Sequence, residues 1–447
     1  MSNMILPYTT SSFNTNGLHK FLPCQAVGIY ARQQGFIKRE GNLNPNKFVQ
    51  ALCSTVGQEE NLTLQSIVTG YNTICPRFEQ LHYENMHDRI KSDGCVNFMT
   101  KNVMALQSKI LKYCARADYE QLVERMNNAG VVIEDIYIHD GSYWHVHEEL
   151  SDLFPGTRSA RLQEAMDNTY NENGEISHRD EGNAQIGLQS TYSLKYGCMV
   201  NMEITAATAN ERNAVIATVK AKVLHIFDSG YRDFDLFRQI DEAGGYLLGK
   251  LQSNAAGEIV SCKIGKEALS EQFAGKKLSD PMLRDYRKHE DMDLIVNFNG
   301  HEYRVIRIYS KKDQKVQYLI TNIMLLTFKA SMIKALYRLR WQIELSFKHL
   351  KSGSNLRGIC TRNTNIIYVL LLSSIMVDLL KILVTSVMTT IFKIKASVYR
   401  ISIHTKSWFP EFLKLLMNGG SDGVLRLLKR LSKAKGIFEK ARQAKSK

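Results

Sequence analysis

The chain has 447 residues and carries 58 lysines and arginines against 44 aspartates and glutamates, which gives a formal net charge of +14 at pH 7. This length exceeds one ordinary hydrophobic core and predicts about two to four domains, and the positive excess favours a polyanionic partner, nucleic acid ahead of an anionic membrane surface. The eight cysteines contain no C-x-x-C pair, which argues against a zinc ribbon or a disulfide framework and favours a reduced, cytoplasmic protein.

The N-terminal region, about residues 1–125, has the periodicity of helices. Its first residues, MSNMILPYTTSS, lack the basic and long apolar segments of a secretory signal. Apolar residues then recur at helical spacing in PNKFVQALCSTV, LTLQSIVTGYNTI and FMTKNVMALQSKILKYCARA. We therefore predict a helical N-terminal domain, either a DNA-binding domain or a plain helical bundle.

Two β-branched segments that each end on an aspartate follow. VVIEDIYIHDGS predicts a strand that ends at Asp140, and KVLHIFDSGY predicts a strand over Val223–Phe227 that ends at Asp228, with a helix from about Asp233. An aspartate at the carboxyl end of a strand lies where open α/β sheets bind their ligands. Aspartate before Gly or Ser is also a common turn residue, so either aspartate alone has that simpler interpretation.

A strand-rich block and a long helical region complete the chain. Asn299-Gly300 is a strong signal for a two-residue hairpin inside the block. The most apolar run, Ile366–Val387, is long enough to raise the question of a membrane span, but Asp378 and Lys381 interrupt it, so we expect a buried core helix. The tail RLLKRLSKAKGIFEKARQAKSK has nine basic residues and one acid, and it fits DNA binding, a subunit contact or a solvated helix.

The segment YRLRWQIELSFKHLKSG predicts one amphipathic helix with an acid among its basic residues. At about 100° per residue, Tyr337, Arg340, Glu344 and Lys351 fall within an arc of roughly 60°. Glu344 could bind a metal there while the arginine and lysine meet phosphates. The segment alone also fits a solvent-exposed helix in which Arg340 and Glu344 form an ordinary ion pair.

Three carboxylates on two strand ends and a packed helix would suit hard divalent cations. Mg²⁺ and Mn²⁺ prefer oxygen ligands, and a pair of such ions activates the attacking oxygen and stabilises the leaving oxygen in phosphoryl displacement. In a strongly basic chain, Asp140, Asp228 and Glu344 therefore predict metal-dependent chemistry on phosphodiesters.

The spacing Y-x2-R-x3-E-x6-K resembles the signature of the YREK group of bacterial insertion-sequence DDE transposases, the insertion-sequence-four family. Tyr337, Arg340, Glu344 and Lys351 match all four of its positions. IHDGS and FDSGYRDFDLF resemble the segments that carry that family's first and second aspartates, and YLITNI is similar to the strand before its signature helix. The resemblance spans about residues 45 to 385. Ser229 departs from it, because many relatives carry an arginine after the second aspartate.

The resemblance implies an α/β protein whose RNase H-like catalytic core is interrupted by a β-rich insertion and flanked by helical N-terminal and C-terminal regions. The expected parts are a helical N-terminal DNA-binding domain (1–125), the first part of the core (126–240), the insertion (241–325), the second part of the core with the signature helix (326–375) and a basic helical C-terminal region (376–447).

The resemblance also implies the chemistry. Asp140, Asp228 and Glu344 would be the catalytic and metal-binding triad for two Mg²⁺ or Mn²⁺ ions, and Tyr337, Arg340 and Lys351 would bind the transposon-end DNA. The implied enzyme is a cut-and-paste DNA transposase that binds the terminal inverted repeats of its insertion sequence, cleaves the ends and transfers the 3′-hydroxyl strands into target DNA. Its implied partners are double-stranded DNA and a second copy in the synaptic complex, at the nucleoid of a bacterial cytoplasm and without a membrane.

Three other functions stay open at the level of sequence. They are an end-binding protein derived from a transposase without cleavage activity, a nuclease without strand transfer, and a membrane-surface protein that uses the 366–387 segment. Trp144 could stack on a displaced base, whereas Trp341 is expected in the core. The histidines near the first aspartate are expected at the surface or around the metal rather than as zinc ligands, because no partner pair follows at a recognised distance. These are His139, His145 and His147.

Overall fold

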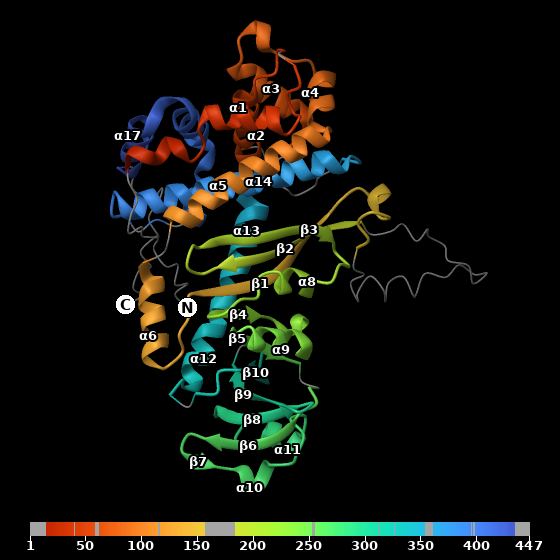
Figure 1. Ribbon diagram of the computed structural model, residues 1–447, viewed down its shortest axis with the longest axis vertical. Helices are drawn as coiled ribbons and strands as arrows, with labels where there is room; N and C mark the ends of the chain where they lie inside the picture. Colours follow the sequence, from red (N-terminus) through yellow and green to blue (C-terminus); the bar gives the residue numbers. More distant parts are fainter. Residues whose placement is uncertain are drawn as a thin grey trace, which may run out of the picture.

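A ten-stranded sheet runs through the middle and one end of the molecule, and a helical body occupies the other end (Figure 1). The computed structural model describes residues 15–39, 41–58, 62–114, 117–156, 184–252, 255–311, 313–325, 327–353, 361–394, 396 and 398–433. The last residues of the predicted basic tail, 434–447, lie outside the described residues. The strand order across the sheet is β3-β2-β1-β4-β5-β10-β9-β8-β6-β7.

The first half of the sheet contains five strands. β1, β2 and β3 form an antiparallel meander, and β4 and β5 continue the sheet parallel to β1. Every residue of β4 is buried, as expected for a short parallel strand covered on both faces. The predicted strand Val223–Phe227 is confirmed, and Asp233 caps the helix that follows it. The bounds are β1 (Asp135–His145), β2 (Gln185–Ser193), β3 (Cys198–Ala206), β4 (Val223–Phe227) and β5 (Tyr246–Leu251).

The second half of the sheet is antiparallel and joins the first half where β10 pairs with β5. Asn299 and Gly300 connect β8 to β9 with φ angles of 54° and 90°, which confirms the predicted two-residue hairpin. Around these strands lies a second apolar core, which includes Phe273 and Phe298. The bounds are β6 (Glu258–Ile264), β7 (Glu267–Ala268), α10 (Ser270–Phe273), α11 (Pro281–Asp285), β8 (Met292–Phe298), β9 (His301–Ser310) and β10 (Lys315–Thr321).

Two of the predicted domain boundaries need correction. The boundary at 240/241 falls inside α9 (Phe234–Glu242), and it assigns β5 to the insertion although β5 pairs in parallel with β4. The boundary at 375/376 falls inside α14 (Thr364–Thr390). A domain boundary does not divide one continuous helix, because such boundaries fall where few contacts cross.

Helices from both ends of the chain form the helical body. α14 packs on α5 and α2, α16 packs on α2, and α17 packs on η1 (Figure 1). A hydrogen bond of 2.8 Å from Asn365 Nδ2 to Asp93 Oδ1 also joins the two regions. The bounds are η1 (Thr15–Lys20), α1 (Cys24–Gln33), α2 (Pro45–Gln58), α3 (Leu64–Ile74), η2 (Arg77–Glu79), α4 (Tyr83–Ile90), α5 (Asp93–Tyr113), α15 (Val398–Ile403), η6 (Thr405–Ser407), α16 (Phe409–Lys414), η7 (Leu415–Gly419) and α17 (Gly420–Ser432).

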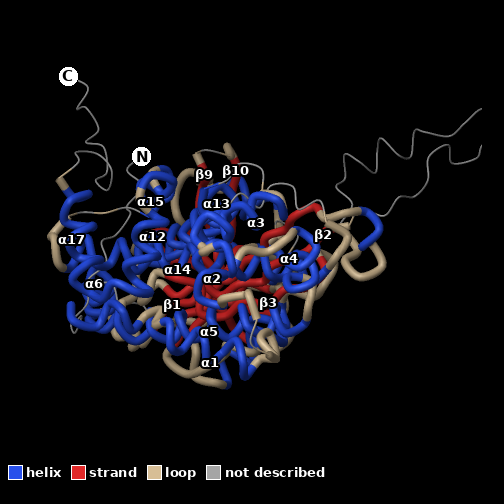
Figure 2. The backbone as a smooth tube through the Cα atoms, turned by 90° about the horizontal axis from the view of Figure 1, so that it is seen from above, coloured by secondary structure: helices blue, strands red, loops and turns tan. Residues whose placement is uncertain are grey.

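The apolar helix α14 is a core helix. It is long and apolar enough to cross a membrane, yet 89% of its most apolar window is buried inside the protein. Figure 2, viewed from the helical end, shows α14 among α2 and α5 in front of the sheet. Burial raises the pKa of Asp378 to about 6 and lowers that of Lys381 to about 8, and the two charges partly offset these shifts. The prediction of a buried core helix over Ile366–Val387 is confirmed.

The remaining helices connect the helical body to the sheet or lie beside the sheet. α12 and α13 lie along β1 and β5 on one side, and α8 and α9 lie on the other (Figure 1). The seven cysteines within the described residues are free thiols, and Cys360 lies outside those residues. The bounds are α6 (Ala117–Asn128), η3 (Glu148–Leu150), α8 (Arg212–Ile216), η4 (Ser229–Tyr231), α12 (Ala330–Tyr337), η5 (Arg338–Arg340) and α13 (Trp341–Gly353).

Candidate active site

Asp140 and Asp228 lie side by side just beyond the last paired residues of the parallel strands β1 and β4. Asp228 follows the end of β4 as predicted, but the prediction that the first strand ends at Asp140 is wrong, because β1 continues to His145 in its antiparallel pairing with β2. Ile138 of β1 is opposite Ile226 of β4, so two residues further along both chains the aspartates are in register and face the same side of the sheet. The Gly141 amide donates to Asp140 Oδ1 at 2.9 Å, and the Gly230 amide donates to Asp228 Oδ1 at 2.8 Å. The sheet therefore brings together the two aspartates that the sequence indicated.

The predicted single helix Tyr337–Gly353 is interrupted just before the third acid. α12 ends at Tyr337, Arg338–Arg340 form a turn of 3₁₀ helix, and α13 begins at Trp341. Glu344 therefore lies in the first turn of α13, while Arg340 precedes that helix. The prediction that four signature residues share the face of one regular helix is corrected, because the tighter turn changes the angle between the residues on either side.

Arg340 links the first and third acids. Its Nη1 lies 3.5 Å from Asp140 Oδ2, and its Nη2 donates a hydrogen bond to Glu344 Oε1. The three side chains are only 20–32% exposed, so water screens these contacts less than it would at the surface. The Arg340 guanidinium thus pairs with the carboxylates of Asp140 and Glu344 at the same time.

The electrostatic balance at Asp140 is unusual for an aspartate. Its pKa is raised to about 7, chiefly by burial; Arg340 and the Gly141 amide oppose this rise, and the charges of Asp228 and Glu211 contribute to it. For Arg340, burial lowers the pKa, but Glu344, Tyr337 and Asp140 outweigh that effect and raise it overall. The site is therefore a crowded group of acids around one buried cation.

Tyr337 and Lys351 take different positions around the acids. Burial raises the pKa of Tyr337 to about 12, and its hydroxyl lies within reach of Arg340. The Lys351 ammonium donates to the Tyr143 carbonyl at 2.9 Å and lies 5.0 Å from the centre of the Trp144 ring. Lys351 is therefore tied to β1 three residues beyond Asp140, and its role toward DNA remains a prediction.

The structure differs from the expected positions of two residues, Trp341 and His139. Trp341 is 49% exposed, so the expectation that it lies in the core is wrong; it begins α13, where its side chain points away from the packed face. His139 is 1% exposed rather than superficial, and its Nε2 lies 2.9 Å from His225 Nδ1. Burial lowers the pKa of both rings, that of His225 to about 3, so this stacked pair is a neutral part of the interior.

Sequence reasoning missed a fourth acid, Glu211. It stands directly before α8, and the hydroxyl of Tyr143 donates a hydrogen bond to its carboxylate. Its charge raises the pKa of Asp140, which shows that the two carboxylates are close. Glu211 ends no strand and belongs to no spaced motif, so only the folded chain reveals its place.

The donor set fits a hard divalent cation. Asp140, Asp228 and Glu344 offer only carboxylate oxygens, the ligands that Mg²⁺ and Mn²⁺ prefer, and the guanidinium of Arg340 already shows that a cation is stable between two of them. Within the part of the chain that the structure describes, no three acidic, histidine or cysteine side chains already converge on one point. A metal that used both Asp140 and Glu344 would compete with the guanidinium for these carboxylates.

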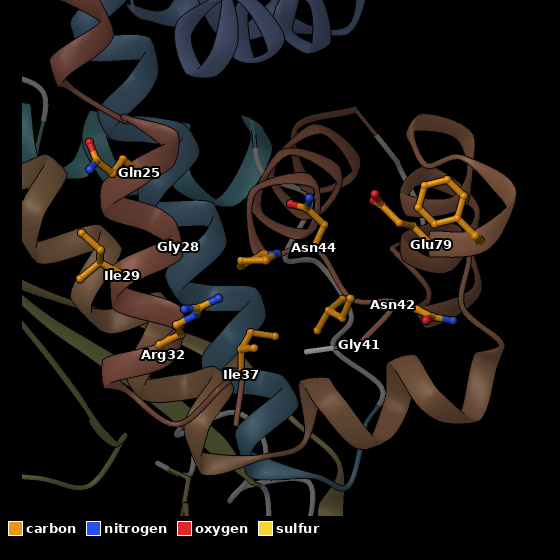
Figure 3. Close-up of a pocket in the computed structure, with 12 residues that line it drawn as sticks. Gln25, Gly28, Ile29, Arg32, Ile37, Gly41, Asn42, Asn44 and Glu79 are labelled. Carbon is orange, nitrogen blue, oxygen red and sulfur yellow. The ribbon is translucent and has the colours of Figure 1, made fainter. Parts of the chain in front are cut away.

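A groove in the helical body is lined by none of the acids and cations described above. It lies in the helical body between α1 and the segment around Asn42 and Glu79, with a volume of about 510 Å³ (Figure 3). Arg32 and Glu79 are its charged lining residues, and Glu79 is paired with Lys47 at 2.7 Å. The carboxylate group beside β1, rather than this groove, is the candidate for catalysis.

Comparison with known proteins identifies the family of the chain. Residues 133–377, more than half of the chain, match the family model described as "Transposase DDE domain", and the match includes Asp140, Asp228 and Glu344. Among solved structures, the chain is similar to the cryo-EM structure of a piggyBac transposase synaptic complex with hairpin DNA, with a TM-score of 0.47 and 10% identity over 98% of this chain and 88% of that chain. No curated protein matches the chain.

Proposed function

Because this chain belongs to the transposase DDE domain family, its function is that of a transposase, and we propose that it is a YREK-type DNA transposase. It binds the terminal inverted repeats of its own insertion sequence, cleaves the DNA at those ends and transfers the freed 3′-hydroxyl strands into target DNA by a cut-and-paste route. Its partners are the double-stranded ends, the target DNA and a second copy of the chain in the synaptic complex.

The observation that carries this proposal is that three acids from separate parts of the sequence lie near one another, two on neighbouring strands and the third linked to the first through Arg340. Asp140 and Asp228 are in register on neighbouring strands, and Arg340 joins Asp140 to Glu344. Nothing in the packing of an ordinary surface helix requires three half-buried carboxylates at one strand end, and their desolvation costs free energy. Such an arrangement is typical of a site that binds cations for chemistry.

These acids would hold two Mg²⁺ or Mn²⁺ ions. When bound, the ions activate the attacking oxygen and stabilise the leaving oxygen of a phosphodiester. The carboxylates of Asp140, Asp228 and Glu344 supply the ligands, and the crowding that raises the pKa of Asp140 is relieved when positive charge arrives.

The signature cations and the tyrosine would hold the DNA. Arg340 loses its carboxylate partners when metal takes them, and its planar fork then suits a phosphate of the transposon end. Tyr337 stays a neutral hydroxyl donor beside Arg340, and the Lys351 ammonium has further N–H donors besides the one that bonds the Tyr143 carbonyl.

The fold that supports this site is an RNase H-like core. In this proposal β3-β2-β1-β4-β5 form the core sheet, with three antiparallel strands followed by two parallel ones. The strands from β6 to β10 are the β-rich insertion between Asp228 and Glu344, and the helices before β1 include the DNA-binding domain.

A cleavage assay on native ends tests the proposal. Double-stranded DNA that carries the sequences on either side of the reading frame is incubated with the protein and Mg²⁺ or Mn²⁺, and nicks, 3′-hydroxyl ends and strand-transfer products are measured. The wild type is expected to produce all three, Asp228→Asn to bind the DNA without cutting it, and the exposed Asp235→Asn to behave as the wild type. End binding by a wild type that never cuts would instead identify a protein derived from a transposase without cleavage activity.

A further inference from the structure

Glu211 approaches β1 from the side opposite Arg340. Successive residues of a strand alternate between its faces, so Asp140 points toward α13 while Gly141 presents its other face. A Cβ atom placed on Gly141 would lie 2.8 Å from Glu211 Oε1 and 2.6 Å from Gln189 Oε1, which is closer than real contacts allow. Because Gly141 has no side chain, the Glu211 carboxylate can lie against the strand at this position.

Two tyrosines connect Glu211 to the segments that carry the aspartates. Tyr143 of β1, three residues after Asp140, donates to Glu211. Tyr231 ends η4, three residues after Asp228, is 2% exposed, and lies close enough to Glu211 for that carboxylate to help raise its pKa, after the larger effect of burial. One carboxylate thus joins the strand of the first aspartate to the loop of the second.

The neighbouring residue reinforces this connection. Arg212 Nη1 lies 3.1 Å from Asp233 Oδ2, and Asp233 caps α9 with its other oxygen through the amides of Asp235 and Leu236. The start of α8 therefore contacts the second half of the loop from Asp228 to Asp233, at Tyr231 and Asp233. Glu211 holds the loop to β1, and Arg212 holds it to α9.

We propose that Glu211 is a positioning residue of the catalytic centre, which fixes the Asp140 strand against the Asp228 loop and whose negative charge strengthens the binding of a divalent cation by these two aspartates. The inference rests on the proposed function. It assigns Glu211 no direct contact with the metal, because its carboxylate lies on the other side of β1 and accepts the Tyr143 hydroxyl. Carboxylates that support the direct ligands of a metal typically change its affinity by about 10–100-fold when they are mutated.

The test is a Mn²⁺ titration of the full-length protein without DNA, in which free Mn²⁺ is measured by electron paramagnetic resonance. Asp140→Asn identifies the site, since its binding isotherm lacks the relevant ions. Glu211→Gln keeps an oxygen that accepts the Tyr143 hydroxyl, but it removes the charge and replaces the second acceptor oxygen with an NH2 group, and we expect it to weaken Mn²⁺ binding about tenfold. Glu302→Gln, an exposed acid on β9, is the matched control and should leave the affinity unchanged.

A second variant keeps the test decisive if Glu211→Gln does not fold. Tyr143→Phe retains the charge but removes one donor that holds it, and a fall in Mn²⁺ affinity of about threefold is expected, the size of one hydrogen bond. Wild-type affinity in either folded variant would overturn the role of Glu211 and leave the transposase proposal intact. Identical Mn²⁺ binding by the wild type and Asp140→Asn would overturn the metal site itself.

Discussion

Arg340 Nη1 lies 3.5 Å from Asp140 Oδ2, so a guanidinium is paired with the carboxylate that we propose as the first metal ligand. The same guanidinium also bonds Glu344. Arg340 therefore neutralises two carboxylates that would otherwise repel each other in a partly buried site. In the proposed function, a metal ion that binds these two carboxylates would therefore take the place of Arg340, and Arg340 would be released.

Arg340→Ala is expected to have opposite effects on metal binding and on DNA binding. Without the competing guanidinium, the DNA-free protein should bind Mn²⁺ more tightly than the wild type, while its complex with end DNA should weaken. Each lost phosphate contact also lowers the slope of log affinity against log salt by about one. Calorimetry and salt-dependent DNA titrations measure both effects, with the exposed neighbour Arg338→Ala as control. Weaker Mn²⁺ binding together with an unchanged salt slope would contradict this exchange.

The raised pKa of Asp140 makes the free energy of unfolding of the metal-free protein depend on pH. Its pKa is raised from 3.8 to about 7, mainly by burial, so between these values the folded chain holds a proton that the unfolded chain has lost. The free energy of unfolding therefore falls as pH rises from about 4 to about 7. Thermal unfolding at pH 5 and pH 8 should show the wild type losing stability relative to Asp140→Asn. Parallel curves for the two proteins would contradict the raised pKa.

Lys351 should contribute to stability as well as to DNA binding. Lys351→Ala removes the bond to the Tyr143 carbonyl and the contact with the Trp144 ring, and a loss of about 1 kcal/mol in the free energy of unfolding is expected. Urea denaturation measures it. Lys348→Ala, an exposed lysine on the same helix, should change the midpoint less. Equal effects of both substitutions would mean that the contacts of Lys351 with β1 are not stabilising.

Arg304 of β9 fixes β8 to the segment that leads into α12. It is 1% exposed, forms two hydrogen bonds with Asp293, and donates to the carbonyls of Leu325 and Phe328 at 2.9 and 2.7 Å. Arg304→Ala leaves the largely buried carboxylate of Asp293, which is 15% exposed, and these carbonyls without their partner and should destabilise the protein by about 3 kcal/mol. The urea midpoint should fall clearly, whereas that of Arg284→Ala should not, because its pair with Asp285 is exposed. A variant Arg304→Ala as stable as the wild type would contradict the account.

The sequence predicts local structure well where a short pattern determines it. The buried strand before Asp228, the cap at Asp233 and the Asn299-Gly300 hairpin follow from apolar runs, helix capping and positive φ angles, all of which act within a few residues. The pairing of Asp140 with Asp228 could be expected from two strand ends, although only the sheet fixes their register.

Features that depend on contacts between distant residues were not predictable in the same way. The 3₁₀ turn before Trp341 is not encoded by apolar spacing, so that tryptophan was expected in the core and is half exposed. Glu211 has no local signature, because its partners Tyr143 and Tyr231 lie 68 and 20 positions away in the sequence. Its place becomes visible only when α8 packs against β2, β3 and α9.

The most direct test of the account is Mg²⁺-dependent cleavage of end DNA by Glu344→Ala, measured beside binding of the same DNA. Glu344 is proposed to hold metal and not DNA, so binding should stay close to that of the wild type. Cleavage should fall on the order of a hundredfold or more, since metal stabilisation of the reacting oxygens is worth several kcal/mol. Cleavage by Glu344→Ala at the wild-type rate would contradict the assignment of Asp140, Asp228 and Glu344 as the catalytic centre.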